Sequence, residues 1–375
     1  MVCMLTETPA ASAARAVATL PSWRVRVLLL AAAYALLAGC GTPYLMQAAG
    51  GEWHVLHERV PIDTVLADPH TPATVHEHLE QVRAARQFAS RELGLPDNDS
   101  YRSYADIGRP DVVWNVVAAP EFSVEPKRWC FPVAGCVAYR GYFHERSARD
   151  FALGLEQQGL DVAVDGVPAY STLGKFADPV LSSMLRYGDD DLAATIFHEL
   201  AHQLLYVRDD SEFNEAFATT VEYVGLERWL AHQGATARMQ AFRDEQQRER
   251  ALVALLAATR GHLVQLYAAP LPREEMVVKK AEVFAQLTVD IRALERRQGV
   301  TYPLYEEWIA AGLNNARLAS VATYFECVPG FMRLLHEQGD DLPRFYAAVR
   351  KLAEQPRAER HARLCTPETT ARLKE

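Results

Sequence analysis

The sequence lacks a dense basic tract, and its 48 acidic residues outnumber its 39 basic residues. The resulting net charge of −9 argues against nucleic acid as a partner. Internal repeats and low-complexity linkers are also lacking, which argues against an array of flexibly joined modules. Nothing in the sequence indicates a nucleotide site or a second metal ion. With 49% hydrophobic and 23% charged residues, the 375-residue chain has the composition of a globular protein with a large core.

The N-terminus has the organisation of a secretory signal. Arg24 and Arg26 precede the apolar run VLLLAAAYALL at 27–37, which ends in Leu-Ala-Gly-Cys at 37–40. The cysteine at the cleavage point resembles the lipobox of bacterial lipoproteins, which implies a signal peptide over 1–40, lipidation of Cys40 and a lipid anchor in the membrane. Gly41 after the cysteine favours the periplasmic face of the outer membrane. An uncleaved anchor helix or a plain signal is the alternative.

Cysteine is scarce, with six residues in the whole chain. Export would place the four that follow the signal in an oxidising compartment. CFPVAGC closes a short loop, so the preferred pairing is Cys130 with Cys136, which leaves Cys327 for Cys365. Four cysteines allow three connectivities, and sequence does not choose among them. Buried free thiols are the other possibility, and no cysteine spacing is typical of a structural zinc cluster.

Apolar spacing predicts an α+β fold that is mainly helical, with a mixed α/β front half joined without a flexible break to a helical back half. The segment 41–72 has no clear period and is expected to be a tether. Helices are expected at 73–93, 151–159, 191–207, 211–232, 235–268, 273–299 and 314–338. Strands are expected at 112–117, 137–143 and 161–167, and a strand-like run at 169–173.

The stretch TIFHELAHQLLY at 195–206 holds the strongest chemical signal. His198 and His202 are four residues apart, so on a helix both imidazoles can point at one ion, and Glu199 lies beside them. Zinc accepts imidazole nitrogen, and a catalytic zinc site needs a third protein ligand. A non-enzymatic protein in which zinc only braces two helices is the other interpretation. Glu199 argues against it, because a structural site needs no base beside its ligands.

The third ligand is expected on the next helix. Glu215 follows a short turn at 208–210, where Asp210 or Ser211 can cap that helix, so an antiparallel return would place Glu215 beside the histidines. Glu222 lies seven residues later on nearly the same helix face. Spacing alone leaves both glutamates as candidates.

The pair of motifs HELAH and NEAFA resembles the zinc signature of gluzincins, particularly of aminopeptidase N-type enzymes. This resemblance implies one zinc ion held by His198, His202 and Glu215, with Glu199 as general base and then acid. The interval between the motifs is shorter than in those enzymes. The longer run HELAHQLLYVRDDSEFNEAFATTVEYVGLERWL also looks like a family of bacterial lipoproteins described as "putative aminopeptidases". By this likeness, 73–235 is a zincin-like catalytic region and 236–375 a helical region that completes the cleft.

These features predict a zinc-dependent peptidase, of the aminopeptidase type, that acts on a peptide or protein substrate. No GxMEN element of aminopeptidase N-type enzymes is present, so an envelope endopeptidase or an amidase is the alternative. Further candidates for orienting the ligands, stabilising the oxyanion or lining the cleft are Asp190, Asp191, Thr219, Glu222, Tyr170, Tyr206, Tyr223, Tyr305 and Tyr324. For Tyr170, the run AYSTLG is either a cleft edge strand that pairs with the peptide or a core strand.

Overall fold

The structure is a computed structural model that describes residues 42–131, 135–300 and 305–365. The chain divides into two units, residues 1–49 and 50–375. Of the first unit the structure describes 42–49, which form the first half of helix α2 (Thr42–His57). The predicted signal peptide and Cys40 lie outside the described residues. None of the helices in the described ranges is long and apolar enough to span a membrane.

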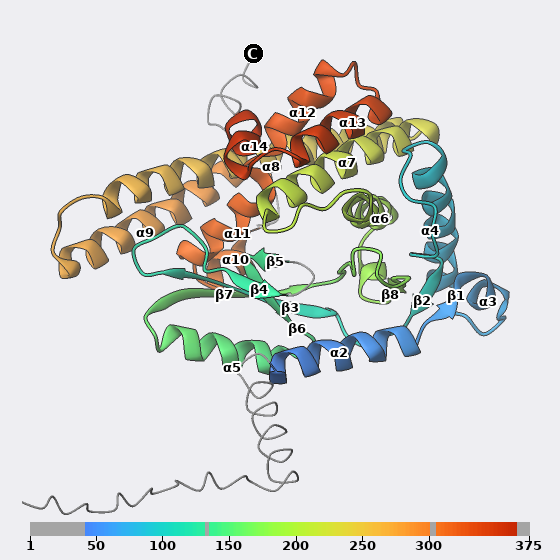
Figure 1. Ribbon diagram of the computed structural model, residues 1–375, viewed down its shortest axis with the longest axis horizontal. Coiled ribbons are helices and arrows are strands. Elements are labelled where there is room, and N and C mark those ends of the chain that lie inside the picture. The colour runs from blue at the N-terminus through green and yellow to red at the C-terminus, as the bar shows by residue number, and fades with distance from the viewer. Residues whose placement is uncertain (1–41, 132–134, 301–304, 366–375) are drawn as a thin grey trace, which may run out of the picture. The chain divides into compact units, whose positions relative to one another are not determined.

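Helices dominate the described residues, and the strands form three small sheets, so the predicted α+β, mainly helical class is confirmed (Figure 1). After α2 the helices are α3 (Ile62–Ala67), α4 (Ala73–Arg91), α5 (Glu145–Glu156), η1 (Met184–Arg186), α6 (Asp189–Leu204), α7 (Ser211–His232), α8 (Thr236–Tyr267), α9 (Arg273–Arg297), α10 (Glu306–Ala310), α11 (Asn315–Phe325), α12 (Val328–Glu337), α13 (Leu342–Ala353) and α14 (Arg357–Leu364). The strands are β1 (Val60–Pro61), β2 (Ser103–Ala105), β3 (Val113–Pro120), β4 (Trp129–Phe131), β5 (Gly135–Val137), β6 (Tyr139–Tyr142), β7 (Leu160–Val167) and β8 (Val180–Leu181).

The main sheet has the order β6-β3-β7, and both pairings are antiparallel. Helix α5 packs against it from below and α11 from above in the view of Figure 1. Because β3 is central and covered, four of its consecutive residues, Val116 to Ala119, are all buried. The second sheet, β1-β2-β8, has β2 parallel to β8. The third is the β4–β5 hairpin.

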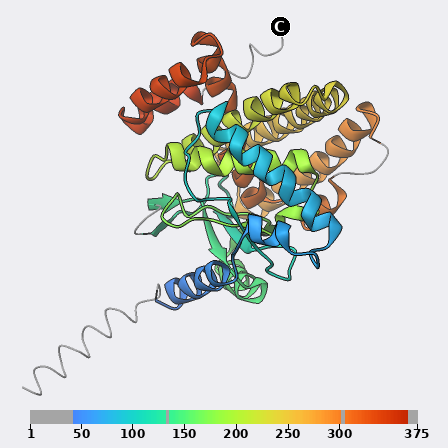
Figure 2. The ribbon, with the colours of Figure 1, turned by 90° about the vertical axis from the view of Figure 1, so that its right-hand side faces the viewer.

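Helices α6 and α7 form the centre of the core. Figure 2 shows α4 lying across this pair, and α12 and α13 pack on α7. Phe217 of α7 stacks on Phe345 and contacts Phe331, and all three rings are fully buried. Gly225 allows α7 to approach α6 closely, because a Cβ there would lie 2.9 Å from the ring of Phe197. The two predicted histidines therefore sit on a helix that is packed on several sides.

The helical back half carries its own apolar cluster. Helices α8 and α9 run antiparallel, and Leu263, Leu287 and Ile291 pack with Leu318 of α11. Both disulfides of the preferred pairing are present: Cys130–Cys136 closes the β4–β5 hairpin, and Cys327–Cys365 joins the start of α12 to the end of α14.

Several predicted elements have different bounds. The segment 41–72 contains helices α2 and α3 and strand β1. The helix expected at 151–159 begins earlier, at Glu145. The single helix expected over 314–338 is wrong: α11 ends at Phe325 and α12 begins at Val328, with proline in its first turn. Proline has no backbone N–H and fits the first turn of a helix but not its interior.

The strand-like run at 169–173 is also a wrong prediction. These residues form no strand in the structure and instead lead into a turn organised by the buried carboxylate of Asp178. That carboxylate accepts hydrogen bonds from the backbone N–H and the hydroxyl of Thr172, at 3.1 and 2.6 Å. The Asp178 side chain thus accepts hydrogen bonds that a neighbouring strand would accept if 169–173 were a strand.

Candidate metal centre

His198 and His202 of α6 and Glu215 of α7 lie together. The Nε2 atoms of the two histidines are 3.2 Å apart, and each lies 3.4 Å from Oε2 of Glu215. His202 and Glu215 are buried, and His198 is half-buried. Two segments separated by a turn thus supply two imidazole nitrogens and one carboxylate oxygen at one point.

The turn between α6 and α7 fixes where Glu215 points. Asn214 is fully buried, and its side chain accepts a hydrogen bond from Val207 N and donates one to Val207 O, both 2.7 Å long. Asp209 adopts a left-handed backbone with φ of 68°, and Asp210 caps α7 by accepting from Phe213 N. Asn214, the residue before Glu215, therefore stabilises the closed turn by bonding to Val207 at its start.

The capping residue is itself held from the C-terminus. One carboxylate oxygen of Asp210 accepts from Arg360 at 2.7 Å, and the other lies 2.7 Å from Nε2 of His361. Both partners belong to α14, which the Cys327–Cys365 disulfide fastens to α12. The last described helix of the chain thus stabilises the turn that precedes Glu215.

The donor triangle fits a tetrahedral zinc ion. Bonds of about 2.0–2.1 Å at tetrahedral angles require ligand atoms about 3.3 Å apart, and the three separations here are 3.2, 3.4 and 3.4 Å. Nδ1 of His198 lies 2.9 Å from Glu222, which leaves Nε2 free to bind an ion. Nδ1 of His202 is buried and has no hydrogen-bond partner among the described residues. Glu222, the competing third ligand, thus contacts the far side of one imidazole, outside the donor triangle.

The electrostatics of the group favour a cation. Burial raises the pKa of the Glu215 carboxyl, but the two histidines outweigh this and lower it to about 2. Burial lowers the pKa of His198, yet its hydrogen bonds to Glu215 and Glu222 raise it well above its ordinary value. Burial raises the pKa of Glu199, partly offset by the two imidazoles. Three carboxylates around two imidazoles leave an excess of negative charge for a metal ion to neutralise.

The residues predicted to orient the ligands, stabilise the oxyanion or line the cleft divide into two groups. Tyr206 and Tyr324 lie near the triangle. The ring of Tyr206 is 6.4 Å from that of His202, and burial and the charge of Glu215 raise its pKa to about 12. Burial and the charges of Glu215 and Glu199 raise the pKa of the Tyr324 hydroxyl well above its ordinary value. Thr219 is buried one turn after Glu215.

Other candidates point elsewhere. The Tyr223 hydroxyl donates to Glu249, and the Tyr170 hydroxyl donates to Glu52. Tyr305 packs in the α8–α9 cluster. Asp190 pairs with Arg238. Asp191 lies in the first turn of α6, where burial raises its pKa and the charge of Glu222 acts in the same direction.

Two tyrosines near the site had not been predicted. Tyr139 of β6 packs beside Val117, and burial followed by the charge of Glu215 raises its pKa well above the ordinary value. Tyr101 is fully buried and has a left-handed backbone with φ of 62°. The charge of Glu199 follows burial among the causes that raise its pKa. Neither residue carries a sequence signal, because only long-range packing brings β6 and the loop before β2 to α6.

Two further groups of possible ligands in the described residues are already engaged. Asp210, Glu212 and His361 lie close together, but Arg360 and Arg357 neutralise the carboxylates. Cys327 and Cys365 lie beside His361 but form a disulfide. The donor triangle on α6 and α7 is therefore the candidate metal centre of the described chain.

A family model described as "Putative aminopeptidase" matches residues 43–364, which is most of the chain. No curated protein and no solved structure is significantly similar to it.

Proposed function

The chain belongs to the family described as "Putative aminopeptidase", and from this premise we propose that it is a zinc-dependent peptidase of the bacterial cell envelope. The convergence of His198, His202 and Glu215 on one point carries the proposal, because their separations match a tetrahedral zinc site. A structural zinc site normally closes with a fourth protein ligand, and the described residues bring three possible ligand atoms together here. Three protein ligands leave a coordination position for chemistry.

A zinc ion held there would supply a Lewis acid that polarises the scissile carbonyl and lowers the pKa of water. Glu199 would take a proton from the attacking water and then pass it to the leaving amine. Its position suits this task, since it lies on the ligand helix, beside His198 but outside the donor triangle. Glu222 would hold the His198 imidazole through Nδ1, so that Nε2 faces the metal.

The family description supports an aminopeptidase as the specific activity. An aminopeptidase differs from an endopeptidase in that it must recognise the free α-ammonium group of its substrate. An envelope endopeptidase or an amidase would use the same metal ligands and the same base. The substrate type therefore needs a direct comparison of free and blocked amino termini.

The envelope location rests on the lipobox-like sequence that ends at Cys40. Lipidation of this cysteine would anchor the enzyme, and we place it at the periplasmic face of the outer membrane. The test is metabolic labelling with a radioactive fatty acid, in which wild-type protein is labelled and Cys40→Ala is not. Unlabelled wild-type protein would remove the anchor from the proposal.

The catalytic proposal is tested on the soluble chain that starts after Cys40, with Glu199→Gln as the matched variant. Zinc is measured by elemental analysis, and activity with fluorogenic aminoacyl amides, their N-acetylated forms and internally quenched peptides. We expect one zinc ion per chain in both proteins and hydrolysis only by the wild type. Preference for free over acetylated amino termini would establish the aminopeptidase.

Two results would contradict the proposal. Absence of zinc from both proteins would refute the assignment of a zinc site to His198, His202 and Glu215. Zinc in both proteins without hydrolysis by either would reassign the triangle to a structural brace between α6 and α7.

A further inference from the structure

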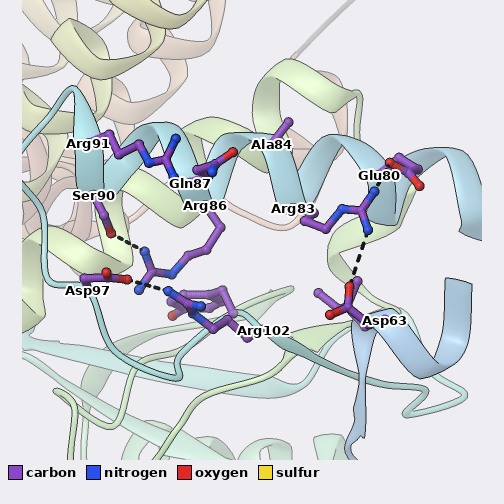
Figure 3. Close-up of a pocket in the computed structure, with 12 residues that line it drawn as sticks. Asp63, Glu80, Arg83, Ala84, Arg86, Gln87, Ser90, Arg91, Asp97 and Arg102 are labelled. Atoms are coloured by element: carbon purple, nitrogen blue, oxygen red, sulfur yellow. Dashed lines mark hydrogen bonds and ion pairs between the residues drawn. The ribbon is translucent and has the colours of Figure 1, made fainter.

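A pocket of about 660 Å³ lies along α4 (Figure 3). None of the donor-triangle residues lines it, although Tyr101, which lies near the metal centre, does. Its walls are α4, the start of α3 and the loop between α4 and β2. Four arginines line it, and they are Arg83, Arg86, Arg91 and Arg102. Asp63, Glu80 and Asp97 are the carboxylates in its lining, so the pocket has an excess of positive charge.

Arg86 is the fixed cation of this pocket. Its side chain is buried, at 3% exposure, and no carboxylate lies within ion-pair distance among the described residues. Its guanidinium donates to the backbone oxygens of Ser100, Pro96 and Asn98, at 2.8–2.9 Å. Nη1 donates to the Ser90 hydroxyl alone among the described residues, although it carries two N–H groups. A buried positive charge is thus held rigidly by neutral groups, with donor capacity left over.

The other arginines are exposed and weakly paired. Arg83 is 53% exposed and bonds to Glu80 at 2.7 Å and to Asp63 at 3.4 Å. Arg102 is 54% exposed and bonds to Asp97. Ion pairs at such exposure contribute little to stability, so an incoming anion could displace Asp63 or Asp97 at small cost. Arginine forks that bind these carboxylates can equally bind a phosphate group.

Like charges meet at one end of the pocket. Figure 3 shows the guanidinium groups of Arg86 and Arg102 close together beneath α4. Burial lowers the pKa of Arg86, and the positive charge of Arg102 is the next cause in the same direction. An anion between the two groups would relieve this repulsion.

We propose that this pocket binds the phosphate group of a small anionic molecule, with Arg86 as the preformed contact and Arg102 and Arg83 as the adjustable ones. Pockets of about 300–1,000 Å³ usually hold molecules larger than a single oxyanion, so the phosphate is expected to be part of a monoester. This binding site is independent of the peptidase proposal.

The loop that lines the pocket also contacts α6. Asn98 donates to the Gln203 side chain at 2.8 Å, and Gln203 in turn donates to the Ser100 hydroxyl at 3.2 Å. Gln203 follows His202 directly on α6. A molecule bound against Arg102 would therefore order the loop that holds the end of the histidine helix, and binding is expected to raise the melting temperature.

The test is calorimetric titration of the full-length chain with inorganic phosphate and, separately, with glycerol 3-phosphate, at constant ionic strength. We expect saturable binding at one site per chain, with a Kd of about 1 mM or tighter. Tighter binding of the monoester would indicate a phosphorylated metabolite or headgroup, and tighter binding of inorganic phosphate would indicate the free ion.

Three variants locate the site. Arg102→Gln and Arg83→Gln are each expected to weaken binding about tenfold. Asp97→Asn is expected to strengthen it, because a competing carboxylate is removed, and misfolding cannot produce a gain in affinity. Arg243→Gln is the matched control, since Arg243 of α8 is 57% exposed and makes a surface ion pair with Glu227 of α7.

Absence of saturable binding by either phosphate compound would overturn the proposal. So would equal weakening in Arg243→Gln, which would indicate unspecific attraction, or weaker binding in Asp97→Asn.

Discussion

The variant Asn214→Ala tests whether the turn between α6 and α7 positions Glu215 for metal binding. The variant removes two 2.7 Å hydrogen bonds and leaves the N–H and C=O groups of Val207 unpaired. An unpaired buried group costs about 1–3 kcal/mol. Val207 is half-buried, so water can reach these groups in part, and we expect a loss of about 2–4 kcal/mol in the free energy of unfolding. Glu215 is the next residue, so its carboxylate should move and zinc affinity should fall about 10–100-fold.

The assay is urea unfolding of EDTA-treated protein together with a competitive zinc titration of each folded variant. Removing the metal keeps zinc binding from adding to the measured stability. Asn315→Ala is the matched control: Asn315 is also fully buried at a helix start, and its side chain donates to the backbone oxygens of Pro120 and Glu121, which belong to neither α6 nor α7. The control should lose stability and keep its zinc affinity. Unchanged zinc affinity in Asn214→Ala, or an equal loss in Asn315→Ala, would refute the assignment of this turn to the metal site.

Three further outcomes can be measured. Glu222→Gln should keep the unfolding free energy but weaken zinc binding about 10–100-fold in the same titration, because the His198 imidazole loses its carboxylate partner; an unchanged affinity would exclude that role. Burial raises the pKa of Asp210, but its hydrogen bonds to His361 and Arg360 outweigh this and lower it. Its contribution to stability is therefore present above the unfolded pKa of about 3.9 and is lost as the pH falls below it. The free energy of unfolding, measured in urea between pH 7 and pH 3, should fall more steeply for the wild type than for Asp210→Asn. Equal pH dependence in the two proteins would contradict this. Replacing Cys327 and Cys365 by serine opens a loop with a sequence separation of 38 and should lower the unfolding free energy by about 4 kcal/mol; a change below about 1 kcal/mol would show that α14 is held without the disulfide.

The secondary structure followed the sequence best where apolar periodicity was long. The helix expected at 211–232 has the same bounds as α7, and the helix expected at 273–299 differs from α9 by two residues. The predicted elements were wrong where a single side chain, rather than apolar periodicity, determined the local backbone structure. Asp178 supplies the hydrogen bonds that a strand at 169–173 would have needed, and a proline divides the helix expected at 314–338.

The candidate site shows the same division. Histidines four residues apart on one helix are adjacent by helical geometry alone, so His198 and His202 could be paired from the sequence. Tyr139 and Tyr101 could not be found this way, because β6 and the loop before β2 reach α6 only through the packed core. Of the two tyrosines proposed for closeness in sequence, Tyr206 lies near His202 and Tyr223 bonds to Glu249 instead. Tyr170, proposed as part of a cleft edge strand, bonds to Glu52.

The sequence by itself determined the helical class, the helix that carries HELAH, and the presence of glutamates on the helix that follows it, because these depend on local spacing. Spacing left both glutamates open, and only the resemblance to gluzincins favoured Glu215. In the tertiary structure it is Glu215 that lies beside the Nε2 atoms of both histidines. Glu215 and Glu222 share a helix face, and spacing cannot tell which carboxylate reaches Nε2 and which reaches Nδ1. The buried bonds of Asn214 and the α14 partners of Asp210 hold the turn between α6 and α7. Across that turn Glu215 lies at the donor triangle, and Glu222 contacts the far side of His198.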